Sequence, residues 1–445
     1  MKKVLILGAG LVARPMVRYL LEIPDFAVTV ASRTVSKAQE LVGANPRGQA
    51  LALLADDDSS LGALVRTHDL VVSLLPYTLH LAVAKHCLAW KKPLVTTSYV
   101  SDAMRALDAD AKRAGIIFLN EIGLDPGIDH MSAMQIIERI KAEGCRVTSF
   151  MSYCGGLPAP EANDNPLGYK FSWSPKGVVM AGRNDGRYLK DGKEVFVPGP
   201  QLFSHRWTLD VPGAGRFEAY PNRNSLPYIA LYGLEGVRTM FRGTLRNPGW
   251  CETLKAIADL GMLTDTPIPG LAQMTCATWF SRHLAGAQDA RRAAAAKLGL
   301  DPEHPILDRF AWLGFFDDRP VGIEHGSDLD VLAKLMLDRM AYKPGERDMI
   351  VLHHEFETER TDPKKAPETQ KTVIHTTLVD YGIPGGDSAM ARTVSLPAAV
   401  AVKLLLTGVI RLTGVHIPVL RELYEPVLAE LSRLGISFQE RASQV

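Results

Sequence analysis

Residues 3–13 read KVLILGAGLVA, and this stretch decides the fold of the N-terminal region. The run from Lys3 to Leu7, apolar from Val4 onward, is a strand candidate. The segment Gly8-Ala9-Gly10-Leu11-Val12-Ala13 then has the spacing G-x-G-x-x-A, which binds a dinucleotide pyrophosphate when it lies between a strand and a helix. Gly8 permits the tight turn, Gly10 lets the pyrophosphate approach the backbone, and Ala13 keeps the helix close to the strand. We expect the helix to begin near Leu11 and its free N–H groups to attract phosphate.

Strand candidates recur along residues 1–125, with amphipathic helical stretches between them: KVLILG, FAVTVAS, DLVVSLLP, KPLVTTS and GIIFLNEIG. This alternation is typical of a doubly wound parallel sheet with helices on both faces. The loops at the carboxyl ends of such strands are where open α/β sheets bind ligands. The sequence therefore predicts an α/β fold whose first domain, over 1–128, is a nucleotide-binding domain of the Rossmann type.

Beyond residue 128 the pattern changes. A helical stretch at 129–143 leads into strand candidates RVTSFMSYCGG, RFEAYPN and VRTMFRGTL, and strands return at DMIVLHHEFETE and KTVIHTTLVDYG. We expect a mixed α/β domain for substrate binding and dimerisation over 129–250 and 343–389, with an all-helical insert over 251–342. Residues 390–445, with the helical run SLPAAVAVKLLLTG near their start, are expected to complete the first domain.

The amino-acid composition indicates a globular protein and gives no sign of a nucleic-acid or membrane partner. The 445 residues are 47% hydrophobic and 22% charged, which suits a globular protein with at least two domains. Fifty Lys and Arg balance 49 Asp and Glu, so nothing favours nucleic acid or a membrane surface as a partner. No export signal or membrane span is predicted, and a cytoplasmic location is expected.

A metal site and a disulfide framework are not expected. The five cysteines have no CxxC spacing: Cys87, Cys145, Cys154, Cys251 and Cys276. The twelve histidines are scattered, and the adjacent pair His353 and His354 is expected to point to opposite faces of a strand.

The end of the second strand candidate indicates the coenzyme. NAD enzymes carry an acidic residue there for the ribose 2′-hydroxyl, whereas this chain has Ser32, Arg33 and Thr34. The guanidinium of Arg33 can pair with a 2′-phosphate while Ser32 and Thr34 donate hydrogen bonds. The sequence therefore favours NADP, with NAD as the alternative, over a solvated arginine that binds nothing.

Six strings are too particular for secondary-structure propensity to explain: TTSYVSDAM (96–104), NEIGLDPGIDH (120–130), YCGGLPAPEANDNPLGYKFSWSPKGV (153–178), AYPNRNS (219–225), RGTLR (242–246) and GERDMIVLHHEFE (345–357). Over essentially the whole chain they resemble the saccharopine reductase family, the glutamate-forming saccharopine dehydrogenases of lysine metabolism. These strings are longer and less degenerate than G-x-G-x-x-G, so the resemblance is specific.

The resemblance implies a homodimer and the reversible reaction of saccharopine, NADP and water to L-glutamate, 2-aminoadipate 6-semialdehyde and NADPH. It implies substrate contacts at Ser98, Tyr99, Asp125, Arg223, Thr244, Leu245 and Arg246. It implies cofactor contacts at Ala9, Gly10, Leu11, Val12, Ser32, Arg33, Leu54, Ala55, Leu75, Thr97, Ser98, Leu124, Asp125, Pro126 and Ser174. Leu54 and Ala55 lie in LLADDD, which departs from the family's pattern.

The chemistry of that reaction agrees with these residues. A tricarboxylate needs guanidinium forks, which Arg223 and Arg246 supply unless they are ordinary structural arginines. Oxidation needs a deprotonated amine, and the imine must then take up water, so a general acid/base is useful. Asp125 is the candidate, with Tyr99 and Cys154 as neighbours that polarise or orient. The alternatives are an Asx-turn cap for Asp125, a buried inert thiol for Cys154, and a packed or capping role for the nearby His130.

Two other functions stay open at this stage. A related C–N oxidoreductase, such as a carboxynorspermidine dehydrogenase or a homospermidine synthase, shares the cofactor domain. A non-catalytic, nucleotide-sensing Rossmann protein would keep Gly8 and Gly10 but has no reason for the polar strings around Tyr99, Asp125 and Arg223.

Overall fold

The structure, a computed structural model, describes residues 1–54, 57–360 and 371–444. It contains two compact units. Of the described residues, the first unit holds 1–146, 360 and 386–439, and the second unit holds 147–359, 371–385 and 440–444. Helix α7 (Ile128–Ala142) belongs to the first unit, so this unit extends past the predicted domain boundary at residue 128.

The first unit is built on a seven-stranded sheet in the order β15-β6-β5-β4-β1-β2-β3. All neighbouring strands in it are parallel, which confirms the predicted fold class. The strands are β1 (Lys2–Leu7), β2 (Phe26–Ser32), β3 (Gly48–Ala52), β4 (Leu70–Ser73), β5 (Leu94–Thr96), β6 (Ile117–Leu119) and β15 (Gly414–His416). The sequence did not predict β3 and β15, because GQALA has no β-branched residue and GVH is too short to show alternation.

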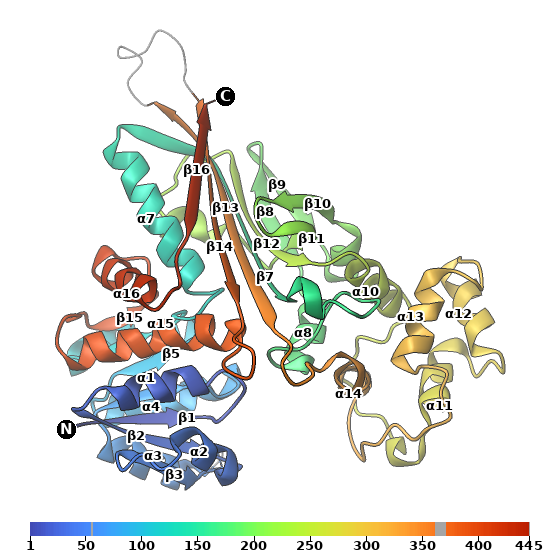
Figure 1. Ribbon diagram of the computed structural model, residues 1–445, viewed down its shortest axis with the longest axis horizontal. Coiled ribbons are helices and arrows are strands. Elements are labelled where there is room, and N and C mark those ends of the chain that lie inside the picture. Colours follow the sequence, from blue (N-terminus) through green and yellow to red (C-terminus); the bar gives the residue numbers. More distant parts are fainter. Residues whose placement is uncertain (55–56, 361–370, 445) are drawn as a thin grey trace. The chain divides into compact units, whose positions relative to one another are not determined.

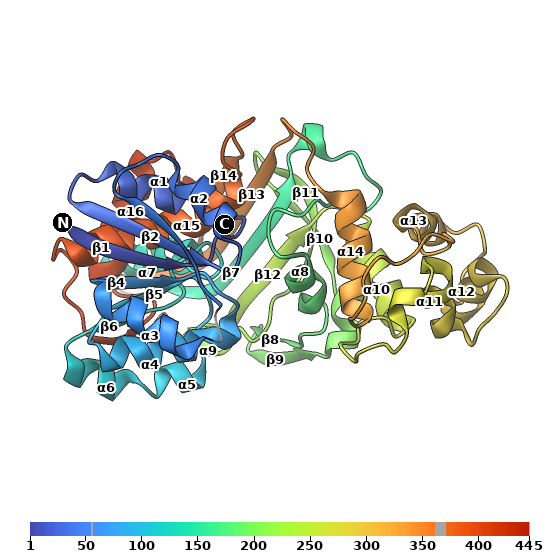
Figure 2. The ribbon, with the colours of Figure 1, turned by 90° about the horizontal axis from the view of Figure 1, so that it is seen from below.

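Helices cover both faces of this sheet (Figure 2). One face carries α1 (Arg14–Glu22), α2 (Val35–Val42), α15 (Ala389–Leu406) and α16 (Arg421–Arg433), and α7 packs on α16. The other face carries α3 (Asp58–Thr67), α4 (His80–Ala89), α5 (Asp102–Arg105) and α6 (Asp108–Ala114).

Helix α15 is the one helix within the described ranges that is long and apolar enough to cross a membrane. Of its 18-residue window, 72% is buried inside the structure, and the helix packs on α1, β4 and β5. Core helices pass the same test of length and composition, so this is weak evidence for a membrane span.

The second unit contains a nine-stranded mixed sheet (Figure 1). Its main path runs β10-β11-β12-β7-β13-β14-β16, with β8 beside β12 and β9 beside β8. The strands are β7 (Cys145–Pro158), β8 (Gly186–Lys190), β9 (Lys193–Val197), β10 (Trp207–Val211), β11 (Gly215–Pro221), β12 (Thr239–Arg246), β13 (Asp348–Arg360), β14 (Lys371–Tyr381) and β16 (Gln439–Gln444). Strands β7 and β12 are parallel, and this pairing sets much of the site geometry below.

Between β12 and β13 the chain is helical. The helices there are α10 (Trp250–Asp259), α11 (Cys276–Ser281), α12 (Ala290–Leu298), α13 (Pro305–Leu313) and α14 (Asp328–Met340), and α8 (Pro175–Ala181) and α9 (Pro227–Leu231) precede them. Their apolar faces share one core with the sheet, in which Trp250, Trp279 and Phe310 are at most 1% exposed. The helical segment is therefore packed into the second unit through a common core.

Candidate functional site: a dinucleotide turn, a carboxylate turn and a buried guanidinium

The two glycines of the turn after β1 have different physical roles. Gly8 has φ +110°, and a Cβ there would lie 3.1 Å from the carbonyl oxygen of Leu74. Gly10 lies outside the positive-φ region, and a Cβ there would meet no atom of the described residues within 4 Å. The chain itself thus requires Gly8, whereas Gly10 leaves open space beside the backbone that a pyrophosphate can occupy.

Helix α1 begins at Arg14, so the prediction of a start near Leu11 was wrong. Leu11 and Val12 form a turn in which the Ala13 N–H donates to the Gly10 carbonyl at 3.2 Å. Pro15 stands in the first helical turn, where its fixed φ and missing N–H favour a helix start.

The predicted cofactor residues of the first unit gather at one edge of the sheet. Those that the structure describes lie at or just after the carboxyl ends of six parallel strands: Gly8, Ala9, Gly10, Leu11 and Val12 after β1, Ser32, Arg33 and Thr34 at and after β2, Leu54 after β3, Leu75 after β4, Thr97 and Ser98 after β5, and Leu124, Asp125 and Pro126 after β6. Ala55 lies outside the described residues. Parallel strands bring these loops together at the ligand-binding edge of the fold.

Arg33 stands alone at the end of β2. Its side chain is exposed, and no described residue forms a hydrogen bond or ion pair with its guanidinium. The Thr34 N–H donates to Ser32 Oγ at 3.4 Å, which orders the loop next to it. An arginine with no protein partner at this place suits a 2′-phosphate.

A second cluster joins the loops after β5 and β6. The Tyr99 hydroxyl donates to Asp125 Oδ1 at 3.0 Å, and both side chains are half-buried. The Asp125–Pro126 peptide is cis, and the Gly123 N–H donates to the Pro126 carbonyl at 2.9 Å. The Glu121 N–H donates to the Ser98 carbonyl at 3.1 Å, which holds the two loops side by side. The structure thus places Ser98, Tyr99 and Asp125 together in the first unit, while Cys154, the other predicted neighbour of Asp125, lies in the second unit.

Two buried residues around this cluster, His80 and Glu121, were missed, whereas His130 was expected to be a packed or capping residue. His80 Nε2 lies 2.8 Å from Ser98 Oγ and 3.1 Å from Thr96 Oγ1, and its Nδ1 lies 2.9 Å from Ser73 Oγ. Glu121 accepts from the Val100 N–H at 3.0 Å and pairs with His130 Nε2 at 2.9 Å. His130 is therefore a packed residue inside α7 that supports Glu121, and the N-cap of this helix is Gly127. His80 lies in the segment that follows the carboxyl end of β4, and this position could have marked it as a site residue in the sequence.

The buried His80 predicts a pH dependence of stability. Burial lowers the pKa of His80 from 6.5 to about 4, so between these values the unfolded chain binds more protons than the folded chain. Stability should therefore fall as pH drops through this window, by up to about 3 kcal/mol. We expect His80→Gln to show a smaller shift of the urea midpoint between pH 7 and pH 4.5 than the unaltered chain. Equal shifts in the two proteins would contradict this assignment.

In the second unit, Arg246 is a buried guanidinium without a carboxylate partner. Arg246 is 5% exposed, its Nη1 donates to the Leu245 carbonyl at 2.8 Å, and among the described residues no carboxylate pairs with it. Its guanidinium lies 5.0 Å from the ring centre of Tyr169 and 5.5 Å from that of Trp250. Arg246 Nε, Tyr169 Oη and Trp250 Nε1 are all buried with no hydrogen-bond partner in the described chain. Buried donors of this kind are normally paired with an acceptor, and an anionic ligand can supply one for the Arg246 guanidinium.

Strand pairing brings other predicted residues to Arg246. Thr244 pairs with Cys154 of β7 and with Tyr220 of β11, so Cys154, Thr244 and Leu245 lie beside Arg246 in the sheet. Burial raises the pKa of Tyr220 to about 12, which keeps its phenol protonated.

Two predicted residues of the second unit lie outside this cluster. Arg223 is exposed and has φ +57°, a conformation that a non-glycine residue rarely adopts and that often marks a functional loop. Ser174 is the N-cap of α8, where its Oγ accepts from the Gly177 N–H at 3.3 Å.

The parallel sheet, the glycine turn and the unpartnered arginine after β2 define a dinucleotide-dependent oxidoreductase of the Rossmann type. The chain belongs to the saccharopine dehydrogenase family. Residues 4–119 match the family model described as the saccharopine dehydrogenase NADP binding domain, and residues 123–436 match the saccharopine dehydrogenase C-terminal domain.

Relatives of known name agree along the whole chain. The NADP-dependent, L-glutamate-forming saccharopine dehydrogenase of Pyricularia oryzae is 40% identical over 452 residues, covering 99% of each protein. The apo structure of the L-glutamate-forming saccharopine dehydrogenase of Saccharomyces cerevisiae is 40% identical, with a TM-score of 0.88 and full coverage of both chains. The homospermidine synthase of Legionella pneumophila has a TM-score of 0.56 at 9% identity, covering 99% of this chain and 91% of that one, and shares the fold alone.

Proposed function

We propose that the chain catalyses the reversible oxidation of saccharopine with NADP and water to L-glutamate and 2-aminoadipate 6-semialdehyde, a step of lysine metabolism. The observation that carries this proposal is the buried Arg246 guanidinium, which has no carboxylate partner among the described residues and can pair with a substrate carboxylate. The relatives that match along the whole chain are named for this activity.

NADP, when bound, accepts the hydride from the carbon of the substrate's C–N bond. The protein's residues handle the protons and the charges. The Asp125 carboxylate takes the proton of the substrate amine, and the Tyr99 hydroxyl, which donates to Asp125, orients it. Loss of the hydride leaves an iminium ion, which adds water and releases one proton to solvent. The carbinolamine nitrogen takes a proton back from Asp125, and the C–N bond breaks while the hydroxyl proton passes to the departing amine, which gives the aldehyde and glutamate.

In the first unit we assign Ser98, Tyr99 and Asp125 to the substrate. In the second unit we assign Arg223, Thr244, Leu245 and Arg246 to the substrate, with Cys154 as a neighbour that polarises. We assign the cofactor to the residues after the six strands of the first unit, together with Ala55 and Ser174. His80 acts through Ser98, whose hydroxyl it positions at 2.8 Å. We further propose a homodimer in the cytoplasm.

Gly10→Val tests the cofactor turn. Since a Cβ at Gly10 meets no described atom, we expect the variant to unfold at the same urea concentration as the unaltered chain. The side chain occupies the space of the pyrophosphate, so the Kd for NADPH, measured by fluorescence titration, should rise at least about 100-fold. Gly8→Ala is the matched contrast, because its positive φ should cost about 1–3 kcal/mol of stability. A Gly10→Val protein that binds NADPH normally would remove this turn from the cofactor site.

Arg33→Asp tests the choice of coenzyme. The change removes a guanidinium with no described protein partner and places a carboxylate where NAD enzymes hold the ribose hydroxyls. We expect kcat/KM for NADP to fall about 100-fold, since hydrogen bonds between charged groups contribute about 1.5–3 kcal/mol, and the preference to reverse toward NAD. Steady-state rates with both coenzymes measure it. An unaltered ratio would show that Arg33 does not select the coenzyme.

The activity itself is tested by absorbance of the reduced nicotinamide on mixing the protein with NADP and saccharopine. Glutamate should appear in an amount equal to the NADPH. Activity only on a carboxylated polyamine would instead place the chain with the carboxynorspermidine dehydrogenases. No change in nicotinamide absorbance with any of these substrates, in a protein that binds NADPH, would favour a nucleotide sensor.

A further inference from the structure

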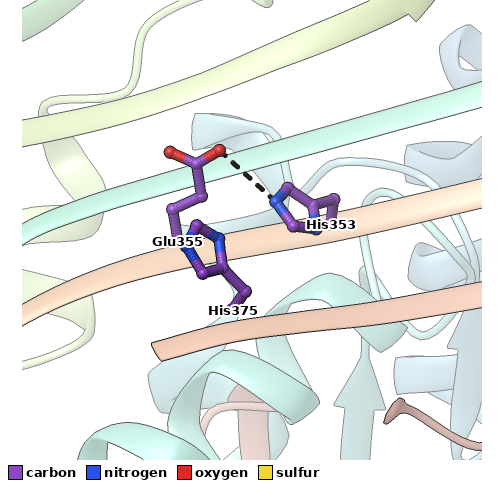
Figure 3. Close-up of side chains that lie close together, drawn as sticks. All are labelled: His353, Glu355 and His375. Atoms are coloured by element: carbon purple, nitrogen blue, oxygen red, sulfur yellow. Dashed lines mark ion pairs between the residues drawn. The ribbon is translucent and has the colours of Figure 1, made fainter. Parts of the chain in front are cut away.

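Three side chains of metal-ligating type lie together on strands β13 and β14 of the second unit. His353 and Glu355 are two residues apart on β13 and share one face of the strand, while His375 pairs with Glu355 across the ladder. One ligand atom from each side chain lies within 4.8 Å of the others. Figure 3 shows His375 pointing from β14 toward the other two.

The spacing of His353 and Glu355 suits a shared cation. His353 Nε2 lies 3.3 Å from Glu355 Oε1. A charge-assisted hydrogen bond between such groups is shorter, about 2.7–2.9 Å. Two ligands of a tetrahedral zinc ion, with bonds of about 2.0–2.1 Å, lie about 3.3–3.4 Å apart. The distance is therefore compatible with one edge of a metal tetrahedron as well as with an ion pair.

Hydrogen bonding prepares the imidazoles for a metal. His353 is 1% exposed, and its Nδ1 lies 2.7 Å from Thr377 Oγ1, directly across the ladder. With the Nδ1 proton donated to Thr377, Nε2 presents its lone pair toward Glu355, which is the arrangement of most metal-bound histidines. Nδ1 of His375 is buried and has no hydrogen-bond partner among the residues that the structure describes.

We propose that His353, Glu355 and His375 bind one divalent transition-metal ion, zinc fitting these donors best, with water completing the coordination. Two imidazoles and one carboxylate suit zinc and its neighbours in the first transition row, whereas Mg²⁺ and Ca²⁺ prefer oxygen ligands. The ion ties β13 to β14 and stabilises the second unit. This proposal replaces the expectation of no metal site. That expectation was based only on ligands that are close together in the sequence, whereas His375 is brought to His353 and Glu355 by strand pairing.

The test uses the full chain after dialysis against a chelator. Zn²⁺ binding is measured by competition with a chromophoric chelator, and Co²⁺ is used as a probe because its visible absorption reports the coordination number. We expect one Zn²⁺ per chain, displacement of Co²⁺ by Zn²⁺, no binding of Mg²⁺ to the same site, and a higher melting temperature with Zn²⁺. Less than one equivalent of Zn²⁺ bound by the unaltered chain, or no effect on its melting temperature, would overturn the proposal.

Variants identify the ligands. Glu355→Gln and His375→Gln keep the size of the side chain and should weaken Zn²⁺ binding more than about 100-fold, while Thr377→Val, which only removes the hydrogen bond to His353, should weaken it about 10- to 100-fold. His325→Gln, an exposed histidine of the same unit, is the matched control and should bind as the unaltered chain does. Circular dichroism confirms folding, and Thr377→Val keeps all three ligands should the others misfold. Unchanged affinity in all three variants would place the ion elsewhere and end the proposal.

Discussion

Arg246→Met is expected to lower kcat/KM for saccharopine by about 100- to 1,000-fold, because two charge-assisted hydrogen bonds to a substrate carboxylate contribute about 3–4 kcal/mol together. Methionine replaces the aliphatic stem of the side chain but lacks the guanidinium that lies over Tyr169 and Trp250. It also removes a buried charge that has no carboxylate partner in the described chain, so the free energy of unfolding should stay the same or rise. Steady-state kinetics and urea unfolding measure the two effects.

The control for this substitution is Arg216→Met. Arg216 pairs with Asp210 at 2.7 Å on the same sheet but is exposed, so we expect its loss to leave kcat/KM within about twofold. NADPH binding should be unchanged in both variants. A normal kcat/KM in Arg246→Met would show that this guanidinium is structural.

Asp125→Asn is expected to lower kcat by about 100- to 10,000-fold, the usual contribution of a general acid/base. Asparagine keeps the size of the side chain and an oxygen that can accept from the Tyr99 hydroxyl, 3.0 Å away. Only the ability to take a proton is lost. The limb of the pH–rate profile that reports deprotonation of Asp125 should therefore disappear, which a purely structural role would not cause.

Two further variants distinguish a proton-transfer role of Asp125 from a structural role. Asp102→Asn changes an exposed aspartate at the start of helix α5 and should leave the pH–rate profile unchanged. Tyr99→Phe removes the hydroxyl but keeps the carboxylate, so it should shift the profile without abolishing it. If Asp125→Asn folds normally and keeps both its turnover and its pH profile, Asp125 does not handle the proton.

The sequence predicted those parts of the fold that have strong local signals. Strand β2 was predicted at its observed bounds because FAVTVAS is β-rich and ends in a loop. The start of α1 was placed too early because Pro15 determines it, while the motif suggested Leu11. Strands β8, β9 and β10 were missed because they are five residues long and gain their stability from pairing.

The residues of the candidate site also fall into those that the sequence could place and those that it could not. Gly10, Arg33 and Asp125 follow strands directly, so a parallel sheet is enough to bring them to one edge. Of the two rings beside Arg246, Trp250 follows it closely in the sequence, whereas Tyr169 is far from it in the sequence and reaches it only through packing. His375 joins His353 through strand register, which no local pattern reveals.

The order of the seven-stranded sheet has a consequence for biosynthesis. The first 119 residues supply six of its strands, but the outer neighbour of β6 is β15, which the ribosome makes only at residues 414–416. Until then the outer edge of β6 has no neighbouring strand. The apolar surface that α15 covers in the folded protein is also exposed until α15 has been made. Such edges promote aggregation, so translation must pass residue 416 before the edge of β6 is covered.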